Sequence, residues 1–294
     1  MTQVAQVDGM MIEFWGVRGS IASPGPDTAG VGGNTSCVAV RCGDTQLVLD
    51  AGTGIRRLGD ALMGAGPVDV TLLLSHQHWD HIQGLPFFVP AYLPSTKLRI
   101  VGGHNGVWTL PETLSHQMRA PVFPVRLDEL GADICLQEVR HGQRFDVGPA
   151  EVRVAKLNHP GGVFAFRIDH GGRSMVYATD TEHYACVDPT LLALTEGADV
   201  LVYDSQYTPD EYSGARGRSK VGWGHSTYVA ACEVARSAGV GQLVLFHHDP
   251  QRTDTEVAHI EERSRALFGP TAVAAREGMR IELAGVAGRV EAAA

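Results

Sequence analysis

The stretch at residues 74–84, LSHQHWDHIQG, constrains this chain more than any other feature of its sequence. It follows an apolar run and places three histidines and one aspartate between positions 76 and 81. His76 and His78 are two residues apart, so an extended backbone directs both side chains to one side. Imidazole and carboxylate groups are ligands for Zn²⁺ and related divalent ions. The stretch therefore predicts a metal site at the end of a buried strand, with a histidine-rich surface loop as the alternative.

Short apolar runs separated by polar loops predict many strands. We expect them at residues 11–15, 36–42, 46–50, 70–75, 97–101, 134–139, 151–157, 163–168, 174–179, 199–204, 242–247 and 280–283. Three helices are indicated: one opening at Asp188, one capped by Ser226 or Thr227, and one at residues 254–268. This pattern predicts an α/β fold of two packed sheets flanked by helices. Several strands end at polar residues able to bind metal, and strand ends are where ligands bind in open α/β sheets.

Composition limits the class of protein. Hydrophobic residues form 44% of the 294, which is enough for a large core and excludes wholesale disorder. No linker or repeat divides the chain, so we expect one domain over residues 1–294. The net charge of −9 argues against strong nucleic-acid binding. Five scattered cysteines, no signal-peptide pattern and no run of about 20 apolar residues predict a cytoplasmic protein without a membrane partner.

Three downstream segments extend the histidine pattern: Asn158-His159-Pro160, Ala178-Thr179-Asp180-Thr181 and Leu245-Phe246-His247. With them, the chain resembles the metallo-β-lactamase superfamily from about residue 11 to residue 247. In that superfamily an HxHxDH motif after a buried strand carries a binuclear metal site. The resemblance implies an αββα sandwich, in which two mixed β-sheets are flanked by helices.

The resemblance also implies two divalent metal ions per chain, Zn²⁺ or Mn²⁺. The residues it assigns to the first ion are His76, His78 and His159, and those for the second are Asp80, His81 and His247. Asp180 would bridge the ions, and a bridging water or hydroxide would be the nucleophile, with Asp80 also accepting its hydrogen bond. A cysteine at the position of Asp180 would indicate a β-lactamase, so the aspartate disfavours antibiotic hydrolysis. His248 is an alternative to His247 as the last ligand.

The segment Gly224-His225-Ser226-Thr227, followed by an Ala-rich stretch, resembles the phosphodiesterase branch, which includes ribonuclease Z and the phosphoribosyl cyclic phosphodiesterases. That resemblance implies that His225 is a general acid and that Asp204, at an earlier strand end, polarises it. A neighbouring carboxylate raises the pKa of an imidazole, which suits this role. The alternatives are that His225 only caps a helix and that Asp204 is an ordinary strand-end acceptor.

Ribonuclease Z grips tRNA with a long basic arm, and this sequence has no such arm. We therefore expect a metal-dependent hydrolase acting on a small, cyclic phosphodiester such as a cyclic nucleotide or a ribose cyclic phosphate. The alternatives are a lactonase or thioesterase on the same metals, or a metal-bound accessory protein without turnover. By analogy with the branch, the protein would be a homodimer.

Other residues leave their roles open. Arg18, in a glycine-rich segment, could reach a phosphate or belong to a plain hairpin turn. The basic run at Arg216, Arg218 and Lys220 could touch a substrate phosphate or be a solvated loop. Trp79 and Trp223 could stack on a ring or pack inward, and His183 could face the substrate or lie in a loop. Asp50 is expected to support the histidine segment from behind. Five further histidines are expected at the surface: His104, His116, His141, His170 and His259.

Overall fold

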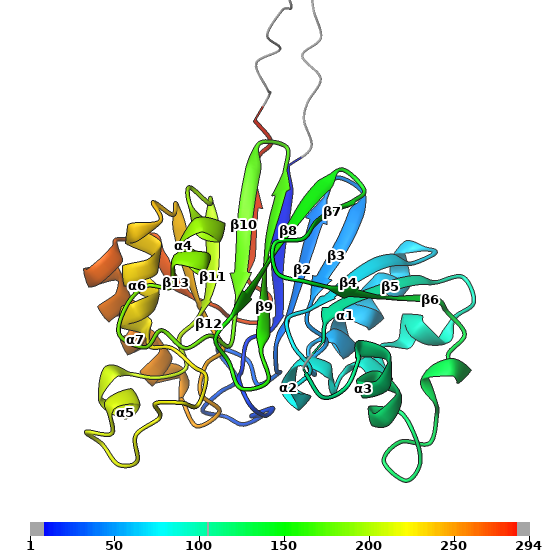
Figure 1. Cartoon of the computed structure of the whole chain (residues 1–294), viewed down its shortest axis with the longest axis horizontal. Helices are drawn as coiled ribbons and strands as arrows, with labels where there is room; N and C mark the ends of the chain where they lie inside the picture. The colour runs from blue at the N-terminus through cyan, green and yellow to red at the C-terminus, as the bar shows by residue number, and fades with distance from the viewer. Residues whose placement is uncertain (1–8, 105, 287–294) are drawn as a thin grey trace, which may run out of the picture.

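The computed structural model describes residues 9–104 and 106–286 and contains two seven-stranded sheets (Figure 1). The strands of the first sheet, in spatial order, are β14 Arg280–Leu283, β1 Met10–Gly16, β2 Cys37–Cys42, β3 Thr45–Leu49, β4 Asp69–Leu74, β5 Lys97–Gly103 and β6 Asp133–Val139. Those of the second are β13 Ala272–Ala274, β12 Gln242–Phe246, β11 Val200–Asp204, β10 Arg173–Ala178, β9 Val163–His170, β8 Ala150–Leu157 and β7 Arg144–Val147.

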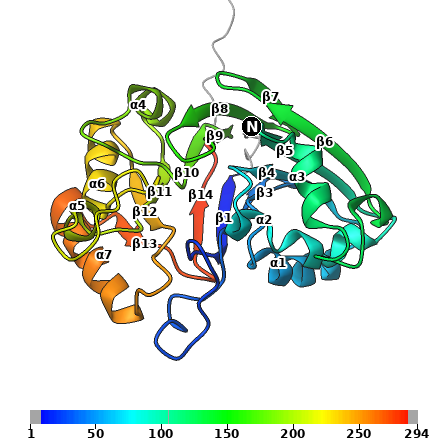
Figure 2. The same ribbon diagram turned by 60° about the horizontal axis from the view of Figure 1, so that its bottom comes forward.

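Helices cover the outer face of each sheet (Figure 2). The first sheet carries α1 Ile55–Leu62, α2 Trp79–Ile82 and α3 Leu110–Gln117, and the second carries α4 Pro189–Thr195, α6 Tyr228–Ser237 and α7 Asp254–Phe268. The short α5, Pro209–Ser213, lies between β11 and α6 in the chain. Four 3₁₀ turns span Met63–Ala65, Leu85–Phe87, Val89–Tyr92 and Leu127–Glu129. None of the helices in the described ranges is long and apolar enough to cross a membrane.

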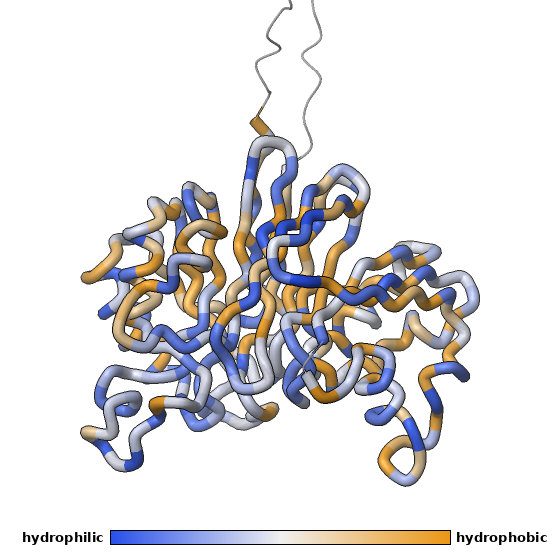
Figure 3. The backbone as a smooth tube through the Cα atoms, in the orientation of Figure 1, coloured by the Kyte–Doolittle hydropathy of each residue, from blue (hydrophilic) through white to orange (hydrophobic). Residues whose placement is uncertain are grey.

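A continuous core lies between the two sheets. Val38 and Leu49 from the first sheet and Phe166, Tyr177 and Phe246 from the second belong to one buried cluster. Figure 3 shows the hydrophobic residues concentrated along these central strands and the polar residues in the outer loops. Together with the outer helix layers, this arrangement confirms the predicted αββα sandwich.

Parallel pairing in the middle of each sheet aligns the strand ends that carry the site. β3, β4 and β5 are parallel neighbours, and so are β10, β11 and β12. β4 is buried along five of its six residues because helices and the second sheet cover both of its faces, which explains its continuous apolar sequence. The Phe164 N–H donates to the Ser75 carbonyl over 2.8 Å and joins the sheets where β4 ends.

Three of these strand ends adopt an uncommon backbone conformation. Asp50 after β3, Asp180 after β10 and His247 after β12 have φ angles of 62°, 50° and 60°. A left-handed φ in a residue other than glycine costs on the order of 1–3 kcal/mol and persists only where surrounding contacts enforce it. Each strand therefore turns sharply at a polar residue.

The expected strands and the three expected helices are all present, most with shifted ends. The short edge strands β7 and β13 and the helices α1, α2, α3 and α5 were not predicted from the sequence, although Thr109 and Glu112 form a capping box before α3. The surface assignment of His170 is wrong: this residue is buried at the end of β9, where it pairs with Arg173 across the hairpin to β10.

Candidate metal centre

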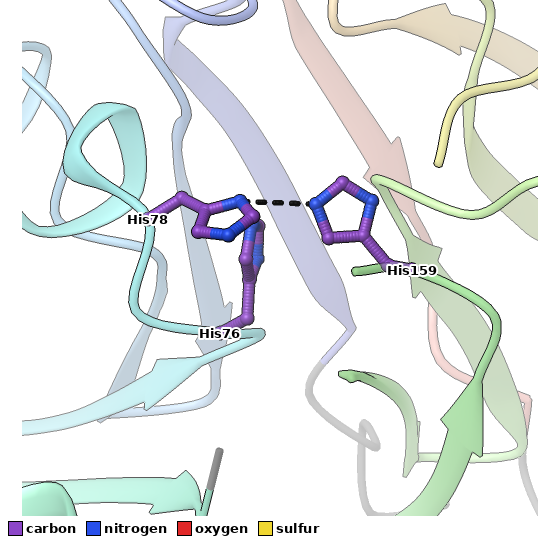
Figure 4. Close-up of side chains that lie close together, drawn as sticks. All are labelled: His76, His78 and His159. Atoms are coloured by element: carbon purple, nitrogen blue, oxygen red, sulfur yellow. Dashed lines mark hydrogen bonds between the residues drawn. The ribbon is translucent and has the colours of Figure 1, made fainter. Parts of the chain in front are cut away.

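Three histidines from two distant parts of the chain form a first cluster (Figure 4). His76 and His78 come from the loop between β4 and α2, and His159 faces them from the loop after β8. His159 Nε2 lies 3.0 Å from His78 Nδ1. One nitrogen of each ring lies within 4.8 Å of the other two, which is close enough for a single ion to contact all three.

A second cluster consists of four buried residues: Asp80, His81, Asp180 and His247. His247 Nε2 lies 3.1 Å from both Asp80 Oδ2 and Asp180 Oδ1. His81 Nε2 lies 3.2 Å and 3.3 Å from the same two oxygens. The other oxygen of Asp180, Oδ2, lies 3.6 Å from His76 Nε2 and 3.9 Å from His159 Nε2. Asp180 therefore directs one oxygen toward each cluster.

The histidines are oriented by hydrogen bonds from their outer nitrogens. His81 Nδ1 donates to Asp50 Oδ2 over 2.7 Å and His159 Nδ1 donates to the Gly224 carbonyl over 2.8 Å. His247 Nδ1 donates to Gln206 Oε1 over 2.9 Å. With the proton on Nδ1, each ring presents the lone pair of Nε2 to the centre, which is the arrangement of a metal-binding histidine.

Asp50 connects the histidine segment to both sheets. Its carboxylate accepts four hydrogen bonds, from Ser75 N (2.7 Å), Ser75 Oγ (2.8 Å), His81 Nδ1 (2.7 Å) and Tyr177 Oη (2.8 Å). Asp50 contacts the histidine segment from behind, as expected. Tyr177 and Gln206 were not identified from the sequence, because no motif near either residue indicates that Tyr177 bonds Asp50 or that Gln206 bonds His247.

The residues fit divalent metal ions. The Nε2 atoms of His76 and His81 are buried and have no hydrogen-bond partner within the described ranges. An unpartnered buried polar atom is costly, and these atoms point into the clusters. Burial opposes charge on Asp180, but His247 and His81 outweigh it and hold the pKa of Asp180 well below its usual value. Burial lowers the pKa of His76, His78 and His159, which favours neutral imidazoles in the first cluster beside the Asp180 carboxylate, and Zn²⁺ and Mn²⁺ accept both kinds of ligand.

His225 and Asp204 lie beside both clusters. His225 Nδ1 is 2.8 Å from Asp204 Oδ2, and both residues are buried. The His225 ring lies 5.2 Å from the ring of His159 and 5.0 Å from that of His247. Burial works against a charge on His225, but the Asp204 carboxylate outweighs it and raises the pKa of His225 to about 9. The side chain that caps α6 belongs to Thr227, so His225 is not the capping residue.

The same geometry admits a second metal-ligand set. Asp180, Asp204, His225 and His247 each offer a ligand atom within 4.8 Å of the others. In this structure Asp204 and His225 bond each other through Oδ2 and Nδ1.

Two residues with open roles lie away from the centre. Arg18 is 0% exposed and donates to the carbonyls of Gly32 (2.8 Å), Asp249 (3.2 Å) and Arg252 (2.6 Å). It binds neighbouring loops together, so the suggestion that it reaches a phosphate is wrong. His248 is buried, and its Nε2 bonds the Ala275 carbonyl over 3.0 Å, so His247 is the histidine that faces the clusters.

The aromatic residues with open roles are at the surface. Trp79 is 75% exposed and Trp223 is 44% exposed, so neither packs into the core. The ring of His183 lies 4.5 Å from that of Tyr212. Among the basic residues, Arg216 pairs with Asp210 over 3.2 Å, whereas Lys220 lies over the ring of Trp223.

Comparison with known proteins agrees with this architecture. The family model of the β-lactamase superfamily domain matches residues 45–248. Ribonuclease Z of Mycobacterium sp. (strain KMS) is 30% identical over 258 residues, covering 84% of this chain and 88% of the relative. The metallo-β-lactamase fold protein YhfI from Bacillus subtilis aligns with a TM-score of 0.71 and 22% identity, covering 94% of this chain and 99% of its own. The short form of human tRNase Z aligns with a TM-score of 0.65 and 19% identity, covering 93% and 99%.

The chain belongs to the metallo-β-lactamase superfamily. It is a metal-dependent hydrolase of that superfamily, similar to ribonuclease Z. The residues of the two clusters come from the predicted motifs, and the fold brings them together at one edge of its sheets.

Proposed function

We propose that the protein is a dinuclear metal-dependent phosphodiesterase that hydrolyses a small cyclic phosphodiester, such as a cyclic nucleotide or a ribose cyclic phosphate. The observation that carries this proposal is the 2.8 Å contact between His225 and Asp204 at the edge of two adjoining metal-ligand clusters. A protonated imidazole in that position can donate its proton to a departing alkoxide. The ribonuclease Z relative supports phosphodiester chemistry, since a ribonuclease cleaves that bond in RNA.

Zn²⁺ or Mn²⁺ would occupy both clusters. The first ion would be held by His76, His78 and His159, and the second by Asp80, His81 and His247, with Asp180 shared between them. When bound, a pair of divalent ions supplies a Lewis acid for the phosphoryl oxygens and an activated water. Ser20 N donates to Asp80 Oδ2 over 2.7 Å and keeps that carboxylate turned toward the centre.

His225 would supply the proton. Its Nδ1 is engaged by Asp204, which leaves Nε2 to donate to the departing oxygen. Asp204 is itself held by Gln206 N (3.0 Å) and Ser226 N (3.3 Å), both donating to Oδ1, so Oδ2 stays aligned with the imidazole. The pair therefore fixes the ring's orientation and favours its charged form.

A small substrate is favoured over tRNA by charge. The chain has a net charge of −9, and its one basic run is partly neutralised because Arg216 pairs with Asp210. Binding a polyanion such as tRNA needs a surface rich in cations, and the acidic residues of this chain outnumber the basic ones by 33 to 24. The five cysteines are free, which supports a reducing cytoplasmic location. A single domain over residues 1–294 and a homodimer stay predictions.

The test is a substrate panel with the Zn²⁺- or Mn²⁺-loaded protein. It contains cyclic nucleotides, a ribose cyclic phosphate, bis(p-nitrophenyl) phosphate, a lactone, a thioester and a precursor tRNA. We expect turnover of the phosphodiesters, fastest for a cyclic one, and its loss on metal chelation. Preference for the lactone or thioester would favour the carbonyl hydrolase alternative, and no turnover at all would favour an accessory protein.

A further inference from the structure

A buried glutamate follows Asp180, the aspartate that lies between the two clusters. Glu182 is two residues further along the chain and is 2% exposed. Its backbone N–H donates to the Asn158 carbonyl over 2.9 Å, so it is bonded to the residue before His159. Within the described ranges, its side chain belongs to neither metal-ligand cluster. The role of this carboxylate therefore depends on the contacts of its two oxygens.

Both oxygens of Glu182 accept hydrogen bonds from the segment before α6. Oε1 accepts from Tyr212 Oη over 2.7 Å and from Gly222 N over 2.8 Å, and Oε2 accepts from Gly224 N over 2.9 Å. All three partners are donors, and an ionised carboxylate is a side chain that offers only acceptors. A glutamine of the same shape would turn its NH₂ group toward at least one of these donors. The position therefore requires a carboxylate and not an amide.

Gly224 connects Glu182 to the first metal-ligand cluster. Its N–H is bonded to Glu182, and its carbonyl accepts from His159 Nδ1 over 2.8 Å. The φ angle of Gly224 is 87°, and a Cβ atom there would lie 2.2 Å from His159 Nδ1 and 2.4 Å from Pro160 Cδ. Only glycine fits, so the backbone can lie directly against the His159 ring. A shift of Gly224 would therefore move the acceptor that orients this histidine.

Hydrogen bonds hold the chain on both sides of His225. The residue before it is bonded to Glu182, and the residue after it, Ser226, donates its hydroxyl to the Thr181 carbonyl. Thr181 and Glu182 directly follow Asp180 in the chain. His225 Nδ1 lies 3.9 Å from Asp180 Oδ2. The loop after β10 therefore fixes the backbone of His225 relative to the aspartate between the clusters.

We propose that Glu182 is a positioning residue, which fixes the proposed acid His225 and the candidate metal ligand His159 through Gly224. Both of its oxygens are occupied by protein donors, so it acts through the backbone and not on the substrate. A displacement of about 1 Å caused far from the chemistry can lower a rate by about 100-fold. Loss of the carboxylate should therefore impair proton donation. This inference rests on the proposed function, because His225 acts only where a leaving group needs its proton.

The test replaces Glu182 with glutamine and compares two leaving groups in the full chain at saturating metal. One substrate is the fastest cyclic phosphodiester of the substrate panel, which releases an alkoxide, and the other is bis(p-nitrophenyl) phosphate. We expect Glu182→Gln to lower kcat about 10–100-fold on the first and much less on the second, whose leaving group needs no proton. Hydrogen exchange measured by mass spectrometry should become faster over residues 219–227.

Asp199→Asn is the matched control. Asp199 accepts from Ser174 N over 2.8 Å at the start of β10 and β11, the ends of these strands opposite to the site. Losing that carboxylate removes a comparable backbone contact, so it should leave the ratio of the two rates unchanged. Tyr212→Phe guards against a misfolded Glu182→Gln, because it removes one donor and keeps the carboxylate. It should change the ratio in the same direction by a smaller factor.

The outcomes separate this proposal from the proposed function. If the wild type hydrolyses phosphodiesters but Glu182→Gln loses equal factors on both substrates, or loses nothing, the positioning role fails alone. An equal change of the ratio in Asp199→Asn also overturns it. If the wild type hydrolyses no phosphodiester, the proposed function fails, and hydrogen exchange decides the remaining question. Faster exchange over residues 219–227 in Glu182→Gln then supports the contact between Glu182 and this segment, and unchanged exchange overturns it.

Discussion

Replacing His225 with alanine separates proton donation from metal binding. In the proposed reaction His225 protonates the departing alkoxide, and positioned acids contribute roughly 10²–10⁴-fold to rate, or about 3–5 kcal/mol of barrier. The metal clusters assigned above do not include His225. We therefore expect His225→Ala to keep its metal ions and to lose about 10²–10⁴-fold in kcat on a substrate with an alkoxide leaving group.

The structural cost of the same change is limited. Asp204 is fully buried and loses the partner of its Oδ2, but its Oδ1 keeps hydrogen bonds from Gln206 N and Ser226 N. One unsatisfied buried acceptor costs about 1–3 kcal/mol, which should leave the protein folded. His225→Asn is the matched variant, because its amide can still donate to Asp204 but holds no titratable proton. It should recover stability without recovering activity.

Two substrates and a pH series complete the assay. p-Nitrophenolate leaves without protonation, so bis(p-nitrophenyl) phosphate hydrolysis should fall much less than hydrolysis of an alkyl diester. The Asp204 carboxylate, working against burial, raises the pKa of His225 to about 9, so the acid form is present below that pH and is lost as pH rises through it. Bound metal cations disfavour a neighbouring positive charge, so they lower the pH at which activity falls. This fall in activity with rising pH should be absent in His225→Ala.

Two results would refute this reasoning. Equal rate losses on both substrates would mean that His225 binds phosphate and does not protonate the leaving group. Loss of metal in His225→Ala would mean that His225 is a ligand, together with Asp180, Asp204 and His247, whose atoms lie close enough for that arrangement.

Three further predictions follow from the same geometry. The purified protein should carry close to two transition-metal ions per chain by elemental analysis, and Asp180→Ala should lose much of the second ion. One tightly held ion with full activity in Asp180→Ala would contradict the assignment of Asp180 as a shared ligand. Asp50→Ala leaves the donors of Ser75, His81 and Tyr177 buried without a partner, so metal affinity should fall about 10–100-fold and chemical denaturation should show a large loss of stability. Precursor tRNA should bind weakly, with a shallow dependence on salt in a filter-binding titration, and efficient trailer cleavage would overturn the small-substrate proposal.

The sequence predicts the residues of the two clusters because of a local rule. His76, Asp180 and His247 lie within two residues of the ends of apolar strands, and parallel strands deliver their carboxyl ends to one edge. The residues that orient the site by hydrogen bonds follow no such rule. Gln206 and Tyr177 contact partners 41 and 127 residues away, and neither residue type indicates a site by itself. Such contacts depend on the packing of two sheets, which a single sequence does not display.

Arg18 shows what a local pattern leaves open. An arginine among glycines can reach a phosphate or belong to a plain hairpin turn, and the sequence does not decide between them. The structure buries it completely because the loops at residues 30–34 and 249–254 close over it and supply carbonyl acceptors. Those acceptors are more than 200 residues away along the chain for two of the three bonds, with separations of 231 and 234. Local spacing cannot distinguish a buried arginine from a ligand-binding one.

Backbone strain indicates how the site keeps its shape. Asp50, Asp180 and His247 hold left-handed φ angles, and so does Ser20, whose N–H reaches Asp80. Each such position costs on the order of 1–3 kcal/mol, so local contacts must enforce it. The four hydrogen bonds to Asp50 and the bond from His247 to Gln206 are such contacts. These hydrogen bonds come from the protein itself and fix the orientation of the candidate metal ligands. Metal binding then loses little free energy to ordering of side chains, which favours high affinity at a site built from separate strand ends.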